Sequence, residues 1–410
     1  MKTFLRISII LIILGLIGYG AYWFFSQKES GQQNPFSDGV SIGDLFPFGT
    51  SGGNSDIQPS GNTGNTSNPV PNIPTTPPKL WQISSEPQSG AVVFNASGTP
   101  TVRYVDKTTG NVFESKLTLT GSKRISNTTV PKVYEAIWQK DGKTLTLQYL
   151  ANDEETIKTV TGKLTPITTR SLEGEMLEEL RTSFLPDNIQ SITTNPQGGT
   201  LAYITTNPNG SRILISTATN PKQIFESVIK DFTISWINKD TIALMTKPSA
   251  LASGQLYFLK TNNGLLSRIM GGPTGLSAIS NQTGTQILYS ESTNGGFKTS
   301  VLNIKNGEVN ELSLQTLAEK CVWSAKNTYI YCAIPRTITN ARYPDDWYQG
   351  RVNFEDSIWQ IDTLTGANKL LVDTVQQKNS LDAINLNLDP EEKYIIFTNK
   401  TDSKLWGLKI

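Results

Sequence analysis

Short apolar strands alternate with polar turns along most of the chain after residue 89. Seven segments share one pattern: an apolar strand, a polar turn, and a second strand rich in β-branched and aromatic residues. The first strands of these segments end at Phe94, Trp138, Thr194, Trp236, Ser280, Trp323 and Leu388. Most of the spacings are 42 to 44 residues, and two are longer, at 56 and 65. A repeat of about 43 residues predicts an all-β propeller, here with seven four-stranded blades.

The last repeat is too short to form a complete blade. The chain ends at Ile410, directly after the third strand of this repeat at residues 404–408. Residues 80–84, which start at Leu80 and end at Ser84, precede the first repeat as residues 123–126 precede the second. We therefore expect residues 80–84 to pair with the C-terminal strand and complete the seventh blade, which removes an exposed sheet edge.

Three segments resemble the repeat of a known class of propellers. WQKDGKTLTL, NPQGGTLAY and SIWQIDTLTG are similar to the W-S-P-D-G-K-x-I-x-F and I-Y-x-x-D-x-x-T-G pattern of WD40-like (PD40) propellers of the Tol-Pal periplasmic type. The whole chain also resembles a family of membrane-anchored bacterial propellers. The resemblance covers residues 80–410 and implies binding of peptides or protein partners. Ala325 and Lys326 stand where Pro and Asp are usual, so six or eight blades stay open.

An apolar run without charges occupies residues 7–25. At about 1.5 Å per residue, a helix of this length spans roughly 28 Å, close to the hydrocarbon thickness of a bilayer. Lys2 and Arg6 precede the run, which favours an N-terminus inside and the remaining chain outside. We expect residues 1–28 to be a single-pass anchor in the bacterial cytoplasmic membrane. A cleaved signal peptide is the alternative, because Gly18 and Gly20 have the spacing of a cleavage site.

Residues 29–79 are dominated by Gly, Ser, Asn, Thr and Pro. Such a segment cannot bury enough apolar surface to offset its conformational entropy. We expect a disordered linker. The domain organisation is therefore an anchor (1–28), a linker (29–79) and a propeller (80–410).

The composition argues against several classes of function. The chain has 36 Lys and Arg against 35 Asp and Glu, so no overall charge attracts nucleic acid. It has no histidine, which removes the commonest general base and zinc ligand and excludes Ser-His-Asp and Cys-His catalysis. No catalytic, metal or cofactor motif stands out. We expect a protein that is not an enzyme and that uses no metal or cofactor.

Cys321 and Cys332 lie in the two inner strands predicted for the sixth repeat. If this hairpin is symmetric about Lys326 and Asn327, the two cysteines face each other. Export from the cytoplasm makes oxidation available. A disulfide is predicted, with two reduced, buried thiols as the alternative.

The longest interruption of the repeat lies in the sixth blade, at residues 335–356. It is rich in Trp, Tyr and Arg, the residue types that contribute most to interfaces. The candidate binding residues are Arg342, Tyr343, Asp345, Asp346, Trp347, Tyr348 and Arg351.

Three interpretations of this insertion stay open. It is a binding surface for a protein or glycan, or a structural flap whose aromatic side chains pack on the blade. In the third, Asp345 and Asp346 act with Glu355 or Asp356 as a glycosidase acid and base, or bind calcium.

A second insertion starts at Arg170, after the second repeat. Leu172, Met176, Leu177 and Leu180 recur at helical spacing. We expect a short amphipathic helix that packs against the ring, with a partner-binding helix as the alternative.

Together these features predict a monomeric, membrane-anchored, extracytoplasmic propeller that serves as a protein- or glycan-binding scaffold of the cell envelope. One alternative is a carbohydrate-active hydrolase that uses the carboxylates of the insertion in the sixth blade. Another is an accessory subunit of a secretion or pilus machine.

Overall fold

The computed structural model describes residues 75–410, apart from 171–175, 218–219 and 378. The expected membrane anchor at residues 7–25 and most of the expected linker lie outside this part. None of the helices within the described residues is long and apolar enough to cross a membrane.

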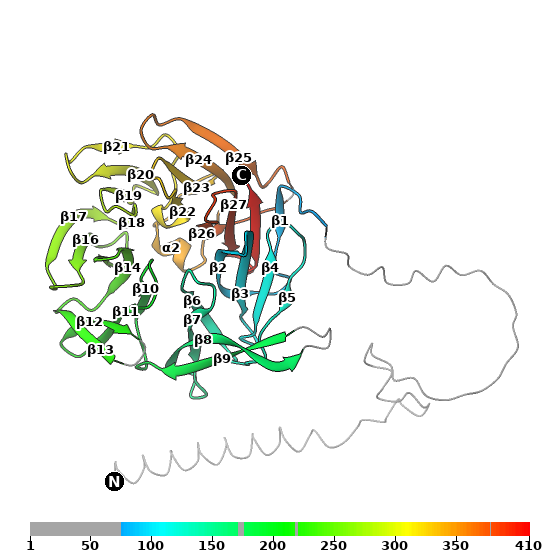
Figure 1. The fold of residues 1–410 in the computed structure, drawn as a ribbon. Coiled ribbons are helices and arrows are strands. Elements are labelled where there is room, and N and C mark those ends of the chain that lie inside the picture. Colours follow the sequence, from blue (N-terminus) through cyan, green and yellow to red (C-terminus); the bar gives the residue numbers. More distant parts are fainter. Residues whose placement is uncertain (1–74, 171–175, 218–219, 378) are drawn as a thin grey trace, which may run out of the picture. The chain divides into compact units, whose positions relative to one another are not determined.

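Seven antiparallel sheets of four strands each surround a common centre in the described part of the chain (Figure 1). The predicted all-β propeller with seven four-stranded blades is thereby confirmed. Consecutive strands of a blade are joined by short connections, except in blade six, where a long insertion separates the second and third strands. Each following blade starts again at the centre with its innermost strand.

Blades one to four follow the chain in order. Blade one consists of β2 (Gln88–Ala96), β3 (Thr99–Asp106), β4 (Val112–Lys116) and β5 (Lys123–Arg124). Blade two consists of β6 (Val133–Trp138), β7 (Thr144–Leu150), β8 (Ile157–Arg170) and β9 (Met176–Phe184). Blade three consists of β10 (Ser191–Thr194), β11 (Leu201–Asn207), β12 (Gly210–Thr217) and β13 (Asn220–Ser227). Blade four consists of β14 (Phe232–Asn238), β15 (Thr241–Thr246), β16 (Ser253–Lys260) and β17 (Leu266–Thr274).

Blades five to seven contain the two short helices. Blade five consists of β18 (Ser277–Ser280), β19 (Gln286–Thr293), β20 (Gly296–Asn303) and β21 (Val309–Glu311). The 3-10 helix η3 (Ala318–Lys320) leads into blade six, which consists of β22 (Cys321–Trp323), β23 (Tyr329–Pro335), β24 (Asp356–Asp362) and β25 (Asn368–Asp373). Helix α2 (Asp345–Tyr348) lies between β23 and β24. Blade seven consists of β26 (Ala383–Leu388), β27 (Tyr394–Asn399), β28 (Leu405–Lys409) and β1 (Leu80–Gln82).

The hydrophobic core lies between adjacent blades. Val105 and Val112 of blade one pack in one cluster with Leu145 and Leu147 of blade two, and all four are at most 1% exposed. These side chains come from the β-branched and leucine positions that the repeat places on the inward faces of its strands. Each blade therefore depends on its neighbours for burial.

The ring closes through blade seven. β1 pairs antiparallel with β28, with Leu80 opposite Leu408 and Gln82 opposite Trp406. The pairing continues beyond the strand, because the Ile83 amide donates to the Leu405 carbonyl at 2.8 Å. Residues from near the two ends of the propeller sequence thus form one sheet.

The amphipathic helix expected after Arg170 is wrong for the residues described there. Residues 176–184 form β9, which pairs with β8 and places Leu180 opposite Leu164. Leu177 and Leu180 are buried, as expected from the hydrophobic spacing, but they lie in a strand and not in a helix. The free edge of β8 offers a full ladder of backbone hydrogen bonds, and this tertiary pairing outweighs a modest helix propensity.

Candidate functional site

The insertion between β23 and β24 covers the centre of the ring, where Figure 1 shows α2. Tyr343, Trp347 and Phe354 are 1%, 3% and 4% exposed. Their rings pack on one another and on Phe297 of blade five, with centroid distances of 4.9 to 5.9 Å. Two of the predicted binding residues, Tyr343 and Trp347, are therefore part of a small aromatic core that fastens the insertion to the ring.

Asp346 holds the insertion together internally. It accepts hydrogen bonds from the Arg342 amide at 2.8 Å and from the Arg351 guanidinium at 3.1 Å. The hydrogen bond from the Arg342 backbone amide and the two nearby guanidinium groups lower the pKa of this carboxyl. Arg342 and Arg351 themselves extend into solvent.

Asp345 connects the insertion to blade four. Its two carboxylate oxygens accept hydrogen bonds from the Ser249 hydroxyl at 2.9 Å and from the Ala250 amide at 2.6 Å. Asp356, in contrast, is fully buried and cannot meet a substrate. The acid and base pairs that the sequence suggested with Asp356 are therefore not available at the surface.

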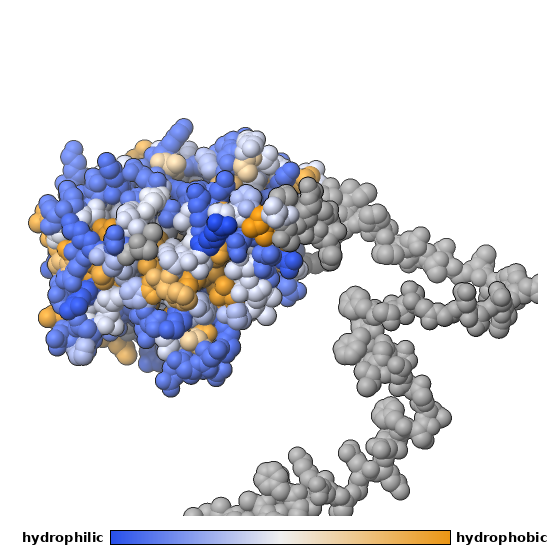
Figure 2. All heavy atoms as spheres, turned by 60° about the horizontal axis from the view of Figure 1, so that its bottom comes forward, coloured by the Kyte–Doolittle hydropathy of each residue, from blue (hydrophilic) through white to orange (hydrophobic). Residues whose placement is uncertain are grey.

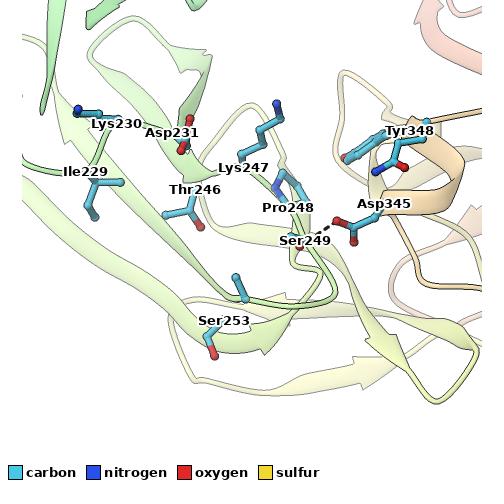
Figure 3. A pocket seen from close by; sticks show the side chains of 12 residues that line it. Ile229, Lys230, Asp231, Thr246, Lys247, Pro248, Ser249, Ser253, Asp345 and Tyr348 are labelled. Atoms are coloured by element: carbon cyan, nitrogen blue, oxygen red, sulfur yellow. Dashed lines mark hydrogen bonds between the residues drawn. The ribbon is translucent and has the colours of Figure 1, made fainter. Parts of the chain in front are cut away.

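A cleft opens where α2 meets the loops of blade four. We call it the α2 cleft; its volume is about 640 Å³ (Figure 3). Its lining residues are Ile229, Lys230, Asp231, Thr246, Lys247, Pro248, Ser249, Ala252, Ser253, Asp345, Tyr348 and Gln349. Of the predicted binding residues, Asp345 and Tyr348 line this cleft.

Exposed apolar side chains gather around the α2 cleft. Ile229 and Tyr348 in its wall are 36% and 38% exposed. Val228 precedes the lining residue Ile229 in sequence and is 85% exposed. Leu251 precedes the lining residue Ala252 and is 78% exposed. Figure 2 shows hydrophobic side chains grouped in patches on the face that it presents. The loops that carry Ile229 and Leu251 gave no signal in the sequence, because they do not interrupt the repeat.

Tyr348 is held in place by Glu319, a partly buried acid. Its hydroxyl donates to Glu319 at 2.6 Å, and Ser277 donates to the same oxygen at 3.4 Å. Burial raises the pKa of Glu319, and burial and the adjacent Glu319 carboxylate raise the pKa of Tyr348. The phenol therefore remains protonated at neutral pH, with its ring fixed at the cleft.

A buried ion cluster lies beneath the insertion. The Lys320 ammonium contacts Asp382 and lies 2.8 Å from Asp356, and all three side chains are fully inaccessible to solvent. Within the described residues, no group of three or more His, Cys, Asp or Glu side chains could hold a metal ion.

Asp356 gives the cluster a defined pH response. Burial raises the pKa of Asp356 from 3.8 to about 6, although Lys320 opposes the shift. Because the folded state then holds a proton that the unfolded state has lost, the free energy of unfolding falls as the pH rises from about 4 to about 6 and stays lower above it. We expect this loss to be on the order of 3 kcal/mol. Urea unfolding across this range should show it, and Asp356→Asn should flatten it.

Asp346 supplies the control for this pH profile. Its pKa is lowered rather than raised, so Asp346→Asn removes a contribution of the opposite sign, which is lost as the pH falls. If the free energy of unfolding of the Asp356→Asn protein fell between pH 4 and 6 as steeply as that of the wild type, Asp356 would not be the group responsible.

A second cavity of about 720 Å³ runs along the innermost strands of the ring, and its lining includes Trp138, Trp236 and Trp323. The Trp138 indole donates to the Gly90 carbonyl of blade one at 3.2 Å. Trp323 donates in the same way to Ile279 of blade five at 3.4 Å. Trp138 and Trp323 therefore connect neighbouring blades.

Cys321 and Cys332 stand directly opposite each other on β22 and β23 and form a disulfide. Cys321 also lines the central cavity. The bond closes the inner hairpin of blade six, immediately after η3.

No protein-family model and no curated protein sequence matches the chain. Solved structures do. An oligogalacturonate lyase in complex with manganese is 9% identical over 82% of this chain and 96% of its own, with a TM-score of 0.54. The oligogalacturonate lyase of Vibrio parahaemolyticus is 9% identical over 83% and 92%, with a TM-score of 0.51. TolB from Acinetobacter baumannii is 12% identical over 66% and 64%, with a TM-score of 0.42.

At these identities the comparisons show the fold alone, and they place the chain among β-propellers. The expected propeller fold is confirmed at this level. The prediction that the chain is not an enzyme is wrong in its reasoning. Propellers of similar fold include lyases, so the fold and the missing histidine do not exclude an enzyme. Lack of histidine excludes particular catalytic groups, and it does not exclude catalysis by carboxylates, lysine or tyrosine.

Proposed function

We propose that the chain is an extracytoplasmic propeller, tethered to the membrane by residues 7–25, that binds a protein of the cell envelope at the α2 cleft. The observation that carries this proposal is that two exposed apolar side chains, Ile229 and Tyr348, line one cleft. Two more exposed apolar residues, Val228 and Leu251, directly adjoin lining residues in the sequence. Exposed apolar groups next to a cleft are typical of protein interaction sites.

The chemistry of the cleft favours a protein segment over a sugar chain. Val228, Ile229 and Leu251 are aliphatic and suit apolar side chains of a partner, whereas sugar rings stack on aromatic faces. Tyr348 supplies a single rigid ring. Lys230 and Lys247 line the same cleft and would pair with acidic groups of the partner.

Crosslinking in intact cells tests this function. Leu251→Asp puts a charge on the apolar rim and should reduce capture of the partner by roughly 10-fold or more, as expected for loss of an interface residue worth about 1.4 kcal/mol. Leu251 is 78% exposed, so the fold should not change.

The matched control is Leu364→Asp. Leu364 is 81% exposed and lies in the turn between β24 and β25, and it is not among the residues that line the α2 cleft. A partner that crosslinks equally to wild type and to both variants would show that the cleft is not its binding site.

A second candidate function is cleavage of a polysaccharide at the same cleft. Asp231 and Asp345 both line it, and glycoside hydrolysis usually employs a pair of carboxylates. Two proteins of similar fold are named oligogalacturonate lyases, so their names indicate cleavage of a sugar polymer. Incubation of the chain with a panel of plant and bacterial polysaccharides, followed by an assay for new chain ends, distinguishes this candidate. Asp231→Asn should abolish any activity found.

A further inference from the structure

Three elements bring one amine and two carboxyl groups together inside the propeller. Lys320 ends η3, Asp356 begins β24, and Asp382 directly precedes β26. The Lys320 Nζ atom contacts Asp382 Oδ1 and lies 2.8 Å from Asp356 Oδ2. The three side chains are 0% exposed, so no water competes for the amine.

Aromatic rings enclose this cluster. Lys320 Nζ lies 5.1 Å from the ring centres of both Trp347 and Phe354. Two opposing carboxylates and one ammonium in such a dry site carry a large desolvation penalty. Conversion of the ammonium and one carboxylate into a neutral amide would remove two of these three charges.

The remaining oxygen of Asp382 is held by two donors. The Trp347 indole N–H donates to Asp382 Oδ2 at 2.8 Å, and the Phe354 amide donates to the same atom at 3.1 Å. When an amine attacks the Asp382 carboxyl carbon, negative charge develops on an oxygen of this group. Two preorganised donors on one oxygen form an arrangement that stabilises such a charge.

Asp356 is placed to move protons. Its Oδ2 faces Lys320 and accepts from the Ala383 amide at 2.6 Å, while its Oδ1 is buried and has no hydrogen-bond partner among the described residues. The pKa of Asp356 is raised to about 6 by burial, so the carboxyl exchanges a proton near neutral pH.

We propose that Lys320 and Asp382 are joined by an intramolecular isopeptide bond that forms within the folded chain, with Asp356 as the proton carrier. Asp356 takes a proton from Nζ, and the neutral amine attacks Cγ of Asp382 as the new C–N bond forms. Asp356 passes this proton to Oδ1 and then carries a second proton from the bonded nitrogen to the same oxygen. The C–O bond breaks, and Oδ1 leaves as one water molecule. Ammonium and carboxylate thus become amide and water, with no oxidant, reductant or cofactor.

The bond would link the start of blade six to the start of blade seven. Fixed proximity makes the reaction effectively unimolecular, which replaces the activation that amide formation otherwise needs. The disulfide between Cys321 and Cys332 begins one residue after Lys320, so the two covalent links would be adjacent.

Mass spectrometry of the full-length chain, denatured and reduced, tests the proposal. We expect a mass lower than that of the sequence by one water molecule. Trypsin should fail to cleave after Lys320, and a branched peptide should join residues 306–326 to residues 379–393. A full sequence mass with ordinary cleavage after Lys320 would overturn the proposal, as would loss of water at any other position.

Variants separate the roles of the three groups. Lys320→Met and Asp356→Asn should each restore the full mass. Lys400→Met is the matched control, because Lys400 also lies 5.1 Å from the Trp347 ring and should leave the branched peptide intact. Water loss at the same positions in the Asp356→Asn protein would remove Asp356 from the reaction.

Discussion

Trp81→Ala is expected to lower the free energy of unfolding by about 3–5 kcal/mol, the usual loss when a buried tryptophan is truncated. Trp81 is 6% exposed and packs with Tyr394, with ring centres 6.1 Å apart. Its cluster also contains Tyr104 and Leu117 of blade one. The side chain therefore stabilises both the closing strand and its junction with the first blade.

Gly407 makes room for this ring. A Cβ atom at Gly407 would lie 2.6 Å from the Trp81 indole, so the third strand of blade seven accepts the tryptophan only because it carries glycine there. Loss of the indole leaves a cavity that neither strand can fill.

Thermal unfolding measures this effect, and a decrease in Tm of roughly 5–10 °C is expected for a domain of this size. Tyr134→Ala serves as the control, because Tyr134 is 41% exposed on β6 and its truncation should shift the Tm far less. Equal Tm values for Trp81→Ala and the wild type would mean that β1 does not hold the ring closed.

Lys320→Ala is expected to destabilise the propeller by about 3–5 kcal/mol, because it leaves two buried carboxylates without a positive partner. If the isopeptide bond is present, its loss adds the entropy of an open 62-residue loop, on the order of 4 kcal/mol by analogy with a disulfide. Urea unfolding at neutral pH measures the sum.

A triple variant gives the comparison for Lys320→Ala. Lys320→Met combined with Asp356→Asn and Asp382→Asn keeps the volume and removes all charges, so it should recover a large part of the lost stability. If the triple variant is no more stable than Lys320→Ala, buried charge is not the cause of the loss.

The repeat made the fold predictable. An apolar strand, a tight turn and a second strand recur because each blade meets the same neighbours in the ring. Trp138 and Trp323 bond to the preceding blade in the same way, 185 residues apart in sequence. A constraint repeated seven times is visible in one sequence, and the missing outer strand of the last copy followed from the same pattern.

The region after Arg170, where a helix was expected, takes its structure from tertiary pairing. Leu177 and Leu180 are compatible with a helix and with a twisted strand, and the free edge of β8 decided between them. That edge is a property of the folded blade, and no local spacing reveals it.

The candidate site was only partly predictable for a similar reason. The composition of residues 335–356 suits an interface and an internal packing cluster equally well, and burial separates Tyr343 and Trp347 from Tyr348. Lys320, Asp356 and Asp382 come together only because the insertion crosses the ring, so their sequence positions gave no signal.

The position of β1 also determines how the propeller bears load. Tension on the N-terminal segment first meets Thr75, whose carbonyl accepts a hydrogen bond from the Thr120 amide at 2.8 Å. It next meets Lys79, whose carbonyl accepts a hydrogen bond from the Lys409 amide at 2.8 Å. From there the load passes into the three-residue ladder between β1 and β28. Under such a force we expect this short ladder to separate before the longer ladders within the same blade.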